Sequence, residues 1–389
     1  MNQDISQIKV GIVGGGQLGK MMVLEGKKMG IYFVVLDPNA DCPAASIVDE
    51  LIVGDFYDPL KIKKLAEKCD VITYEFEHIN AEVLIDLQKS GHKIYPSPHT
   101  LMKIQDKAYQ KQFLQSNDIP VANFEVIDSL DDLNRAVETF GVPLLLKSCR
   151  GGYDGKGNYL IKSHDEIEEA YKALGEGVWK LMVEEFVPFT KEISVVVGRG
   201  ISGDLEVFPL CENLHENNIL KMTIFPARVN DIVATKAKEL AFKTMEVLEG
   251  VGVFCIEMFV TEEEDVLVNE IAPRTHNSGH YTIEGCSISQ FGQHIRSILE
   301  LPLGKVQLNR AGVMINILGE ANYRGKAKLV GAKEALALPQ VFLHYYGKIT
   351  TSPYRKVGHV TILGDTIDEA FERAEIVKNT IKVIGEEVI

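Results

Sequence analysis

The sequence predicts an α/β protein of two or three domains, and three observations support that prediction. The chain has 389 residues, which is more than one ordinary hydrophobic core organises. Short apolar runs typical of strands alternate with segments of helical spacing along most of the chain. Hydrophobic residues make up 46% of the chain and charged residues 25%, the proportions of a soluble globular protein.

The net charge and the cysteines restrict the partners and the compartment. A formal charge of −14 argues against nucleic acid or an anionic membrane as the main partner, so an anionic substrate needs local basic pockets. No apolar run approaches the roughly 20 residues of a membrane span. The start, Met1–Asp4, lacks the pattern of a signal peptide. The six cysteines include no C-x-x-C pair, which indicates reduced thiols and a cytoplasmic location.

A βαβ unit is predicted at the start of the chain. The run Ile8–Val13 has the character of a strand, and a helix and a second apolar strand ending at Asp37 follow it. Between them Gly14, Gly16 and Gly19 satisfy the pattern G-x-G-x-x-G at the helix N-terminus, where free N–H groups favour an anion. This pattern alone leaves three interpretations open: NAD(P), another phosphate ligand, or a structural turn.

The next predicted strand, Val71–Tyr74, carries acidic residues at its carboxyl end. Ligands in open α/β sheets collect at such ends, so Glu75 is a candidate acceptor for ribose hydroxyls. A solvated carboxylate without a ligand is the alternative interpretation of Glu75.

The middle of the chain again alternates helices and strands. A helix is predicted over Asp106–Ser116, a strand over Phe124–Ile127, a second helix over Ser129–Phe140 and a strand over Val142–Lys147. Lys147 closes the last strand, and it either extends its amine to solvent or binds a phosphate. The glycine-rich segment that follows favours the phosphate.

That segment, Arg150–Asn158, has four glycines in seven residues. Its backbone can approach a phosphate closely and move as a flap, because glycine has no Cβ, and Lys156 adds a mobile positive charge. It is not a Walker A loop, since Gly157 stands where Ser or Thr would reach Mg²⁺.

The segment Trp179–Val187 is predicted to be a strand that ends in two acids and a bulky apolar pair. Its end offers backbone groups and an apolar wall to an adenine ring, with Glu192 nearby for ribose hydroxyls. An ordinary strand with exposed acids is the alternative interpretation.

Two carboxylates are predicted to face each other on a β-hairpin, Val251–Val260 and Asp265–Ile271. If Glu262 faces Asp265 across the turn, counting back along the ladder pairs Glu257 with Glu270. Opposed side chains lie on one face about 5 Å apart at Cβ, and two like charges so close need a divalent cation. Under the flap, this pair predicts an ATP–Mg²⁺ site.

The segment after the hairpin is polar and rich in turns. Arg274 suits a small oxyanion, because its planar fork matches a carboxylate-like group. His276 and His280 are four residues apart, but the Asn, Ser and Gly between them disfavour a helix and argue against a transition-metal pair.

The last part of the chain begins with a predicted linker, Leu299–Val306. Three strands and a closing helix follow: Ala311–Leu318, Val341–Tyr346, Gly358–Leu363 and Thr366–Ile381. The basic residues Lys348 and Arg355–His359 stand out in this acidic chain, as either a solvated turn or a phosphate pocket.

Five of these segments together resemble one family. They are Gly14–Gly19, Gly151–Gly157, Asn269–Arg274, His276–His280 and Arg355–His359. They resemble the ATP-grasp enzymes, and among these the 5-(carboxyamino)imidazole ribonucleotide synthases of purine biosynthesis, over nearly the whole chain. The resemblance implies a Rossmann-like, biotin-carboxylase-like domain at 1–104, an ATP-grasp domain at 105–300 with a lid at about 124–187, and a small mostly-β domain at 301–389.

The resemblance also implies a site. ATP would be bound by Lys107, Lys147, Gly152, Tyr153, Asp154, Gly155, Lys156, Gly157, Asn158, Glu184, Glu185, Phe186, Val187, Glu192, His215, Asn269 and Glu270. One or two Mg²⁺ ions would be held by Glu257 and Glu270. Aminoimidazole ribonucleotide would contact Gly16, Gln17, Leu18, Glu75, Tyr153, Asp154, Lys156, His276, Asn277, Lys348 and Arg355, with its phosphate on helix N–H groups and on the two basic residues. Asp154, Lys156 and Arg274 would be catalytic, with Arg274 facing bicarbonate.

The implied reaction is an ATP-dependent carboxylation. Bicarbonate would be activated as carboxyphosphate, and the exocyclic amine of aminoimidazole ribonucleotide would attack it, with Asp154 accepting the proton. A homodimer is also implied. The alternatives are a sister ATP-grasp ligase that activates formate, and a nucleotide-binding regulator without catalysis.

Overall fold

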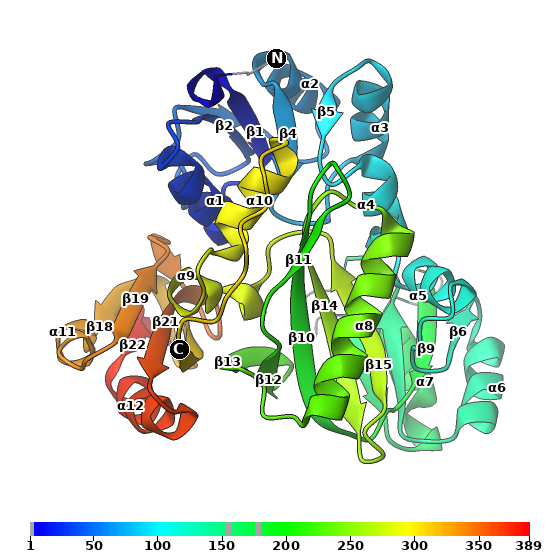
Figure 1. The fold of residues 1–389 in the computed structure, drawn as a ribbon. Coiled ribbons are helices and arrows are strands. Elements are labelled where there is room, and N and C mark those ends of the chain that lie inside the picture. The colour runs from blue at the N-terminus through cyan, green and yellow to red at the C-terminus, as the bar shows by residue number, and fades with distance from the viewer. Residues whose placement is uncertain (1–3, 152–156, 176–179) are drawn as a thin grey trace.

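The structure is a computed structural model that describes residues 4–151, 157–175 and 180–389. It confirms an α/β protein with a parallel sheet at the N-terminus and antiparallel sheets elsewhere. Figure 1 places the N-terminal sheet above the other two parts of the chain, and the C-terminal strands to one side of the central sheet. No helix within the described ranges is long and apolar enough to cross a membrane.

The N-terminal sheet has five parallel strands in the order β3-β2-β1-β4-β5. They are β1 (Lys9–Val13), β2 (Tyr32–Asp37), β3 (Glu50–Val53), β4 (Val71–Tyr74) and β5 (Lys93–Ile94). The helices between them are α1 (Gln17–Lys27), α2 (Pro59–Lys68), α3 (Ala81–Lys89) and α4 (Pro98–Gln105). This order reverses direction between β1 and β4, which confirms the Rossmann-like prediction and places a ligand-binding crevice at their carboxyl ends.

A small four-stranded antiparallel sheet follows, in the order β6-β9-β7-β8. Its elements, with the helix α5 before it, are α5 (Lys107–Ser116), β6 (Phe124–Ile127), α6 (Leu130–Phe140), β7 (Leu144–Ser148), β8 (Asn158–Ile161), α7 (Ile167–Ala173) and β9 (Leu181–Glu185). The predicted helix 129–140 is confirmed because its ends are local: the Ser129 hydroxyl accepts from the Asp132 N–H at 3.1 Å, and Gly141 ends it at φ 77°.

The central sheet has nine strands. Along the path β15-β14-β10-β12-β13-β16-β21-β19, with β11 beside β10, these are β10 (Phe189–Arg199), β11 (Leu205–Val207), β12 (Cys211–Glu216), β13 (Ile219–Phe225), β14 (Gly252–Thr261), β15 (Val266–Ala272), β16 (Ala311–Leu318), β19 (Val341–Tyr345) and β21 (Lys356–Gly364). Helix α8 (Asp231–Leu248) covers one face, and its Ala237, Ala241 and Met245 pack on Ile256 and Val268. The last three strands continue the sheet into the C-terminal part.

The C-terminal part also contains two helices and several short strands. These are β17 (Tyr323–Lys326), β18 (Lys328–Val330), α11 (Ala332–Leu336), β20 (Thr350–Thr351), α12 (Ile367–Thr380), β22 (Lys382–Ile384) and β23 (Glu387–Val388). The predicted strand Ala311–Leu318 and the closing helix are confirmed, whereas the short strands are not among the predicted ones. Segments of two to four residues carry too little periodicity to be predicted from the sequence.

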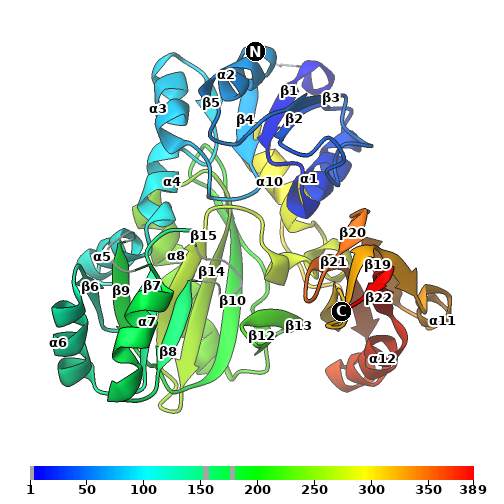
Figure 2. The same cartoon turned by 180° about the vertical axis from the view of Figure 1, so that it is seen from behind.

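Helix α10 (Gln290–Ile298), which follows α9 (Thr282–Gly285), returns from the central part to the N-terminal sheet. Its Phe291, Ile295 and Ile298 share a core with Val10 and Met22. Figures 1 and 2 both place α10 beside α1. The N-terminal and central parts are therefore one packed body, and the predicted domain limits at 104 and 300 stay a prediction.

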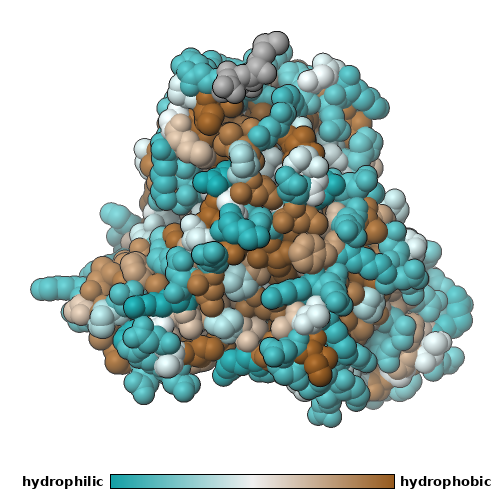
Figure 3. Space-filling view, viewed as in Figure 1, coloured by the Kyte–Doolittle hydropathy of each residue, from teal (hydrophilic) through white to brown (hydrophobic). Residues whose placement is uncertain are grey.

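The surface of the molecule is mixed in character. Figure 3 shows hydrophilic side chains along most of the outline of one face, with hydrophobic groups between them near its middle. Among the described cysteines Cys42, Cys149, Cys211, Cys255 and Cys286 are buried, Cys69 is half-buried, and all six are free thiols.

Candidate functional site

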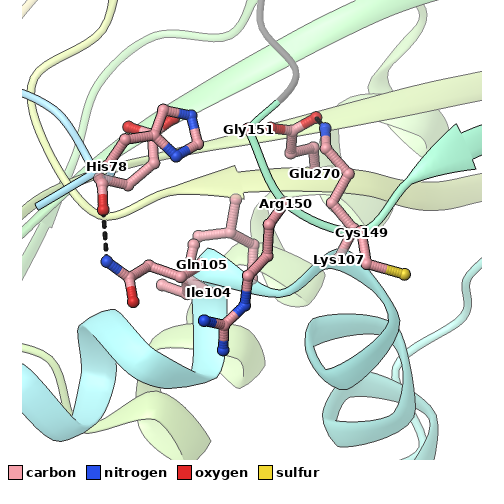
Figure 4. Close-up of a pocket in the computed structure, with 10 residues that line it drawn as sticks. His78, Ile104, Gln105, Lys107, Cys149, Arg150, Gly151 and Glu270 are labelled. Carbon is pink, nitrogen blue, oxygen red and sulfur yellow. Dashed lines mark hydrogen bonds and ion pairs between the residues drawn. The ribbon is translucent and has the colours of Figure 1, made fainter. Parts of the chain in front are cut away.

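The predicted site lies where the start of helix α5, the end of strand β7 and the β14–β15 hairpin meet. A hollow there is lined by Glu77, His78, Ile104, Gln105, Lys107, Cys149, Arg150, Gly151, Glu270 and Ile271. Figure 4 shows the Lys107 side chain reaching Glu270 next to Gly151, where the first described part of the flap ends. Gly152, Tyr153, Asp154, Gly155 and Lys156, all predicted to bind ligands, lie outside the described residues.

The predicted pairing of Glu257 with Glu270 is confirmed, since the two residues are directly opposed in the β14–β15 ladder. The pairing assumed at the turn, from which the predicted register was counted, is wrong. Val260 faces Val266, so Glu262 does not face Asp265, whose carbonyl instead accepts from the Thr261 N–H at 3.0 Å.

An extra residue in β15 restores the predicted register. The ladder shifts by one position between Glu257 and Met258, which leaves Asn269 as a β-bulge. Bulges change the direction of neighbouring side chains and occur often at functional sites. The carbonyl oxygen of the Asn269 side chain is buried without a partner among the described residues, which is consistent with its predicted contact to ATP.

The two acids differ in charge state. Burial, reinforced by the negative charge of Glu270, raises the pKa of Glu257 to about 7. Burial also acts to raise the pKa of Glu270, but Lys107, whose amine lies 2.8 Å from its Oε2, outweighs burial and lowers that pKa. Glu270 therefore has a lysine partner, whereas no lysine or arginine of the described residues forms an ion pair with Glu257.

This pair fits a hard divalent cation. Carboxylate oxygens are the ligands that Mg²⁺ prefers, and a second positive charge would relieve the repulsion felt by Glu257. Within the described ranges no group of three or more His, Cys, Asp or Glu side chains forms a metal site. A metal held by these two acids would thus complete its shell with phosphate oxygens and water, as Mg²⁺ does in phosphoryl-transfer sites.

Lys147 is buried and shares one carboxylate with a second lysine. Its amine lies 2.8 Å from Glu184 Oε2, and the amine of Lys111 lies 3.3 Å from Oε1 of the same residue. Burial favours the neutral acid, but Lys147 and then Lys111 outweigh it and lower the pKa of Glu184 to about 2. Glu184 was predicted only as part of a wall for adenine, and Lys111 was not predicted at all.

Of the remaining predicted ATP contacts, Gly157 and Asn158 lie at the start of β8, where the Gly157 carbonyl accepts from the Ser148 N–H at 2.8 Å. The others lie at the end of β9 and on β10 and β12. Glu185 and Phe186 are exposed, and Val187 is half-buried, as a wall for a planar ring requires. Glu192 and His215 form an ion pair across β10 and β12. Burial acts to lower the pKa of His215, but its bond to Glu192 outweighs burial and raises that pKa.

Arg274 has a partner that the sequence did not predict. Its Nε and Nη2 donate to the two carboxylate oxygens of Glu77, at 2.5 and 3.2 Å, and its Nη1 donates to the Thr275 carbonyl. This fork uses part of the donor set that was assigned to bicarbonate. Glu77 follows β4, so the ion pair joins the N-terminal sheet to the central one.

His276 and Asn277 follow β15 and face the same region. The His276 Nδ1 lies 2.9 Å from the Ser278 hydroxyl, and its Nε2 lies 3.7 Å from Glu257 Oε1. Gln290 on α10 holds the backbone of His276 through both its N–H and its carbonyl group. Both polar atoms of the Asn277 amide are buried without a partner among the described residues, which is consistent with the predicted contact of Asn277 with the substrate.

The glycine pattern after β1 is already occupied by a side chain of the protein. The N–H groups of Gly16 and Gly19 donate to the two oxygens of Glu75, at 2.6 and 2.7 Å. A Cβ at Gly16 would lie 2.4 Å from Glu75 Oε1, and one at Gly14 would lie 2.3 Å from its Cγ. The glycines are therefore needed for the approach of Glu75.

This arrangement bears on the expected phosphate contact, which stays a prediction. A phosphate at the Gly16 and Gly19 N–H groups would displace or repel the carboxylate of Glu75. A ribose hydroxyl suits that carboxylate better, as was first predicted for Glu75. Contacts of Gln17 and Leu18 with the substrate stay predictions.

One basic residue from the end of the chain, Lys348, acts on the same place. Burial raises the pKa of Glu75, the Gly19 and Gly16 N–H groups oppose that rise, and the charge of Lys348 opposes it to a smaller extent. The amine of Lys20 on α1 donates to the Tyr346 carbonyl at 2.9 Å, which fixes this loop against the glycine turn. Arg355 is exposed and donates to the Thr350 carbonyl and hydroxyl.

His359 does not belong to this basic group. It is fully buried, stacks on His344 with ring centroids 4.4 Å apart, and also contacts His280. Burial keeps the pKa of His359 well below its usual range, so the ring is neutral. The predicted basic cluster therefore ends before His359.

Two cationic or acidic groups of the site were missed in the sequence, Lys111 and Glu77. Lys111 carried one usable signal, since it stands four residues after Lys107 and so on the same face of the predicted helix. Glu77 stood at the carboxyl end of a predicted strand, where ligand-facing acids are expected. Neither signal identified Glu184 as the partner of Lys111 or Arg274 as the partner of Glu77.

Comparison with known proteins places this geometry in a family. Three family models match: the ribonucleotide synthetase preATP-grasp domain over residues 7–105, the ATP-grasp domain over 112–291, and the phosphoribosylaminoimidazole carboxylase C-terminal domain over 312–373. N5-carboxyaminoimidazole ribonucleotide synthase of Bacillus subtilis is 42% identical over 361 residues, which cover 92% of each chain.

Solved structures agree. N5-carboxyaminoimidazole ribonucleotide synthetase of Thermotoga maritima aligns with a TM-score of 0.90 and 45% identity, covering 98% of this chain and 100% of that one. The synthase of Aspergillus clavatus, solved with ADP and 5-aminoimidazole ribonucleotide, aligns with a TM-score of 0.88 and 35% identity over 96% of this chain and 99% of that one. The chain therefore belongs to the N5-carboxyaminoimidazole ribonucleotide synthase family of ATP-grasp ligases.

Proposed function

We propose that this chain carboxylates the exocyclic amine of 5-aminoimidazole ribonucleotide at the expense of ATP and bicarbonate. The products are N5-carboxyaminoimidazole ribonucleotide, ADP and phosphate. The observation that carries the proposal is the opposed pair Glu257–Glu270 with Lys107 and Lys147 around it. Family membership supplies the identity of the substrates.

The first step follows from the weak reactivity of bicarbonate. Bicarbonate is a resonance-stabilised anion, so transfer of the γ-phosphoryl group of ATP to one of its oxygens creates carboxyphosphate, which has phosphate as a leaving group. Charge neutralisation and positioning provide most of the assistance in such transfers. Lys107 and Lys147 provide positive charge near the transferred group, and Arg274 near the carboxyl oxygens.

The second step joins carbon to nitrogen. The amine attacks the carboxyl carbon of carboxyphosphate, and phosphate leaves. The amine also loses a proton, and we assign Asp154 in the flap as the base that accepts this proton. His276 and Asn277 would orient the ribonucleotide, with Glu75 on its ribose and Lys348 and Arg355 on its phosphate. Because carboxyphosphate hydrolyses readily, closure of the flap would exclude water.

Mg²⁺ is part of the proposal. Glu257 and Glu270 would hold one or two ions, which, when bound, offset the charge of the phosphate oxygens. The fit rests on two opposed carboxylates, one of which has a pKa raised to about 7 by burial and by the charge of the other.

The decisive assay is ADP release by the purified chain. We expect ADP only when bicarbonate and 5-aminoimidazole ribonucleotide are both present. Release with formate in place of bicarbonate would move the assignment to a formate-activating ATP-grasp ligase, and ATP binding without any turnover would favour a regulator.

Assembly and location remain expectations, the first from the family resemblance and the second from the cysteines. A homodimer predicts a mass near twice 43.2 kDa in sedimentation equilibrium. A cytoplasmic location predicts recovery with the supernatant after cell lysis.

A further inference from the structure

Helix α5 presents two lysines to the nucleotide side of the site. Lys107 and Lys111 are four residues apart and so lie on one face of the helix. Lys107 contacts Glu270 at 2.8 Å, whereas Lys111 contacts Glu184 at 3.3 Å. Each lysine of α5 therefore meets one of the two carboxylates on which ATP binding is proposed to depend.

The group around Glu184 carries one positive charge too many. Glu184 is 3% exposed, Lys111 2% and Lys147 6%, and one carboxylate faces two ammonium groups. A buried charge without a counter-charge is unfavourable, so such a group favours the binding of a further anion. A polyphosphate provides one, which explains why the surplus cation stands beside the flap.

Lys111 and Lys147, the two lysines that contact Glu184, are not equivalent. Lys147 is the last residue but one of β7, two residues before Cys149 at the wall of the hollow, and it is the lysine predicted to bind phosphate. Lys111 lies on the helix, and its neighbour Gln110 accepts from the Ile271 N–H at 3.0 Å, which ties α5 to β15. Lys111 is therefore the fixed member of the pair, and Lys147 is the member able to turn to a ligand.

We propose that Lys111 is a positioning residue that holds Glu184 when Lys147 leaves this carboxylate for the phosphates of ATP. The inference rests on the proposed function. Without Lys111, Lys147 would be the sole cation that the described residues place on Glu184, and its movement to ATP would leave a buried carboxylate without that partner. That penalty would appear as lost ATP affinity.

The test compares Lys111→Met with the wild-type chain and with Lys238→Met, an exposed lysine of α8 that serves as the matched control. ATP binding is measured by calorimetry without bicarbonate or ribonucleotide, so it does not depend on the identity of the reaction. We expect Lys111→Met to weaken ATP binding about tenfold, Lys111→Arg to restore most of it, and Lys238→Met to bind like the wild type.

A steady-state measurement separates positioning from general damage. Lys111→Met should raise KM for ATP about tenfold while KM for 5-aminoimidazole ribonucleotide changes by less than about twofold. Equal increases in both KM values, or unchanged ATP affinity, would overturn the proposal. Failure of the wild type to turn over, with ATP binding still dependent on Lys111, would instead reject the proposed function.

A second pair of variants decides the matter if Lys111→Met does not fold. Once Glu184→Gln removes the carboxylate, Lys111 has nothing to hold. We therefore expect Glu184→Gln and the double variant Glu184→Gln, Lys111→Met to bind ATP with affinities that agree within about threefold. A larger difference between these two variants would show that Lys111 acts by another route.

Discussion

At the scale of single residues, the site is an arrangement of charges whose partners come from distant positions. Glu257 is the informative one, because burial and Glu270 together raise its pKa to about 7 while Glu270 is neutralised by Lys107. Carboxylates in this state bind cations readily and serve structure poorly. Their removal should therefore affect chemistry far more than folding.

Replacing Glu270 by Gln tests the role of this pair. We expect ADP release to fall on the order of a hundredfold or more, because the metal ligand and the partner of Lys107 are both lost. Glu262→Gln, in the exposed turn of the same hairpin, should leave the rate unchanged. Equal melting temperatures for the two variants would establish that the fold is kept, and full activity of Glu270→Gln would remove the metal assignment.

At the scale of elements, the hairpin β14–β15 and the C-terminal loops set the distances between the groups. The bulge at Asn269 is what brings Glu257 and Glu270 opposite each other despite the shifted turn. The loop after β19 lies against α1 through the Lys20 bond to Tyr346, which is consistent with the proposed role of the end of the chain in binding the ribonucleotide. Recognition of the ribonucleotide and of ATP should thus respond to different elements.

Replacing Arg355 by Ala tests this division. We expect KM for 5-aminoimidazole ribonucleotide to rise about tenfold or more, because a charge-assisted contact to its phosphate is lost, while KM for ATP stays near its wild-type value. The control is Arg324→Ala, at an exposed position of strand β17, which should leave both KM values unchanged. Comparable increases in both KM values would contradict a phosphate pocket at Arg355.

The helices and strands were easier to predict from the sequence than the contacts between them. Ser129–Phe140 and Ala311–Leu318 were predicted closely, because capping and periodicity are local signals. The ion pairs of Glu184 and Glu77 were not predicted, since their partners lie 37 and 197 residues away and no spacing rule connects them. The pairing of Glu257 with Glu270 was correct only because the turn and the bulge shift the ladder in opposite directions.

At the scale of the whole molecule, one ion pair ties two of the sheets together. Glu77 follows β4 and Arg274 follows β15, and both side chains are about 15% exposed. Burial acts to raise the pKa of Glu77, but Arg274 outweighs it and lowers that pKa to about 2. Stability gained from this shift is complete above the ordinary pKa of 4.5 and is lost as the pH falls towards 2.

Urea unfolding of Glu77→Gln at several pH values tests this link. At pH 7 we expect the variant to be less stable by on the order of 3 kcal/mol, because Arg274 is left buried without its partner. The difference from the wild type should shrink as the pH falls from 4.5 towards 2, because Glu77 takes up its proton in the unfolded chain before it does so in the folded one. A difference that is constant over this range would contradict the role of the pair.

The packing of α10 on the N-terminal sheet has a consequence for truncated fragments of this protein. A fragment that stops near residue 104 would keep Val10 and Met22 but lose Phe291, Ile295 and Ile298, which cover them. Such a fragment would expose a hydrophobic surface to water and aggregate. Joining residues 289–299 to it through a short tether should yield a soluble, separately foldable half.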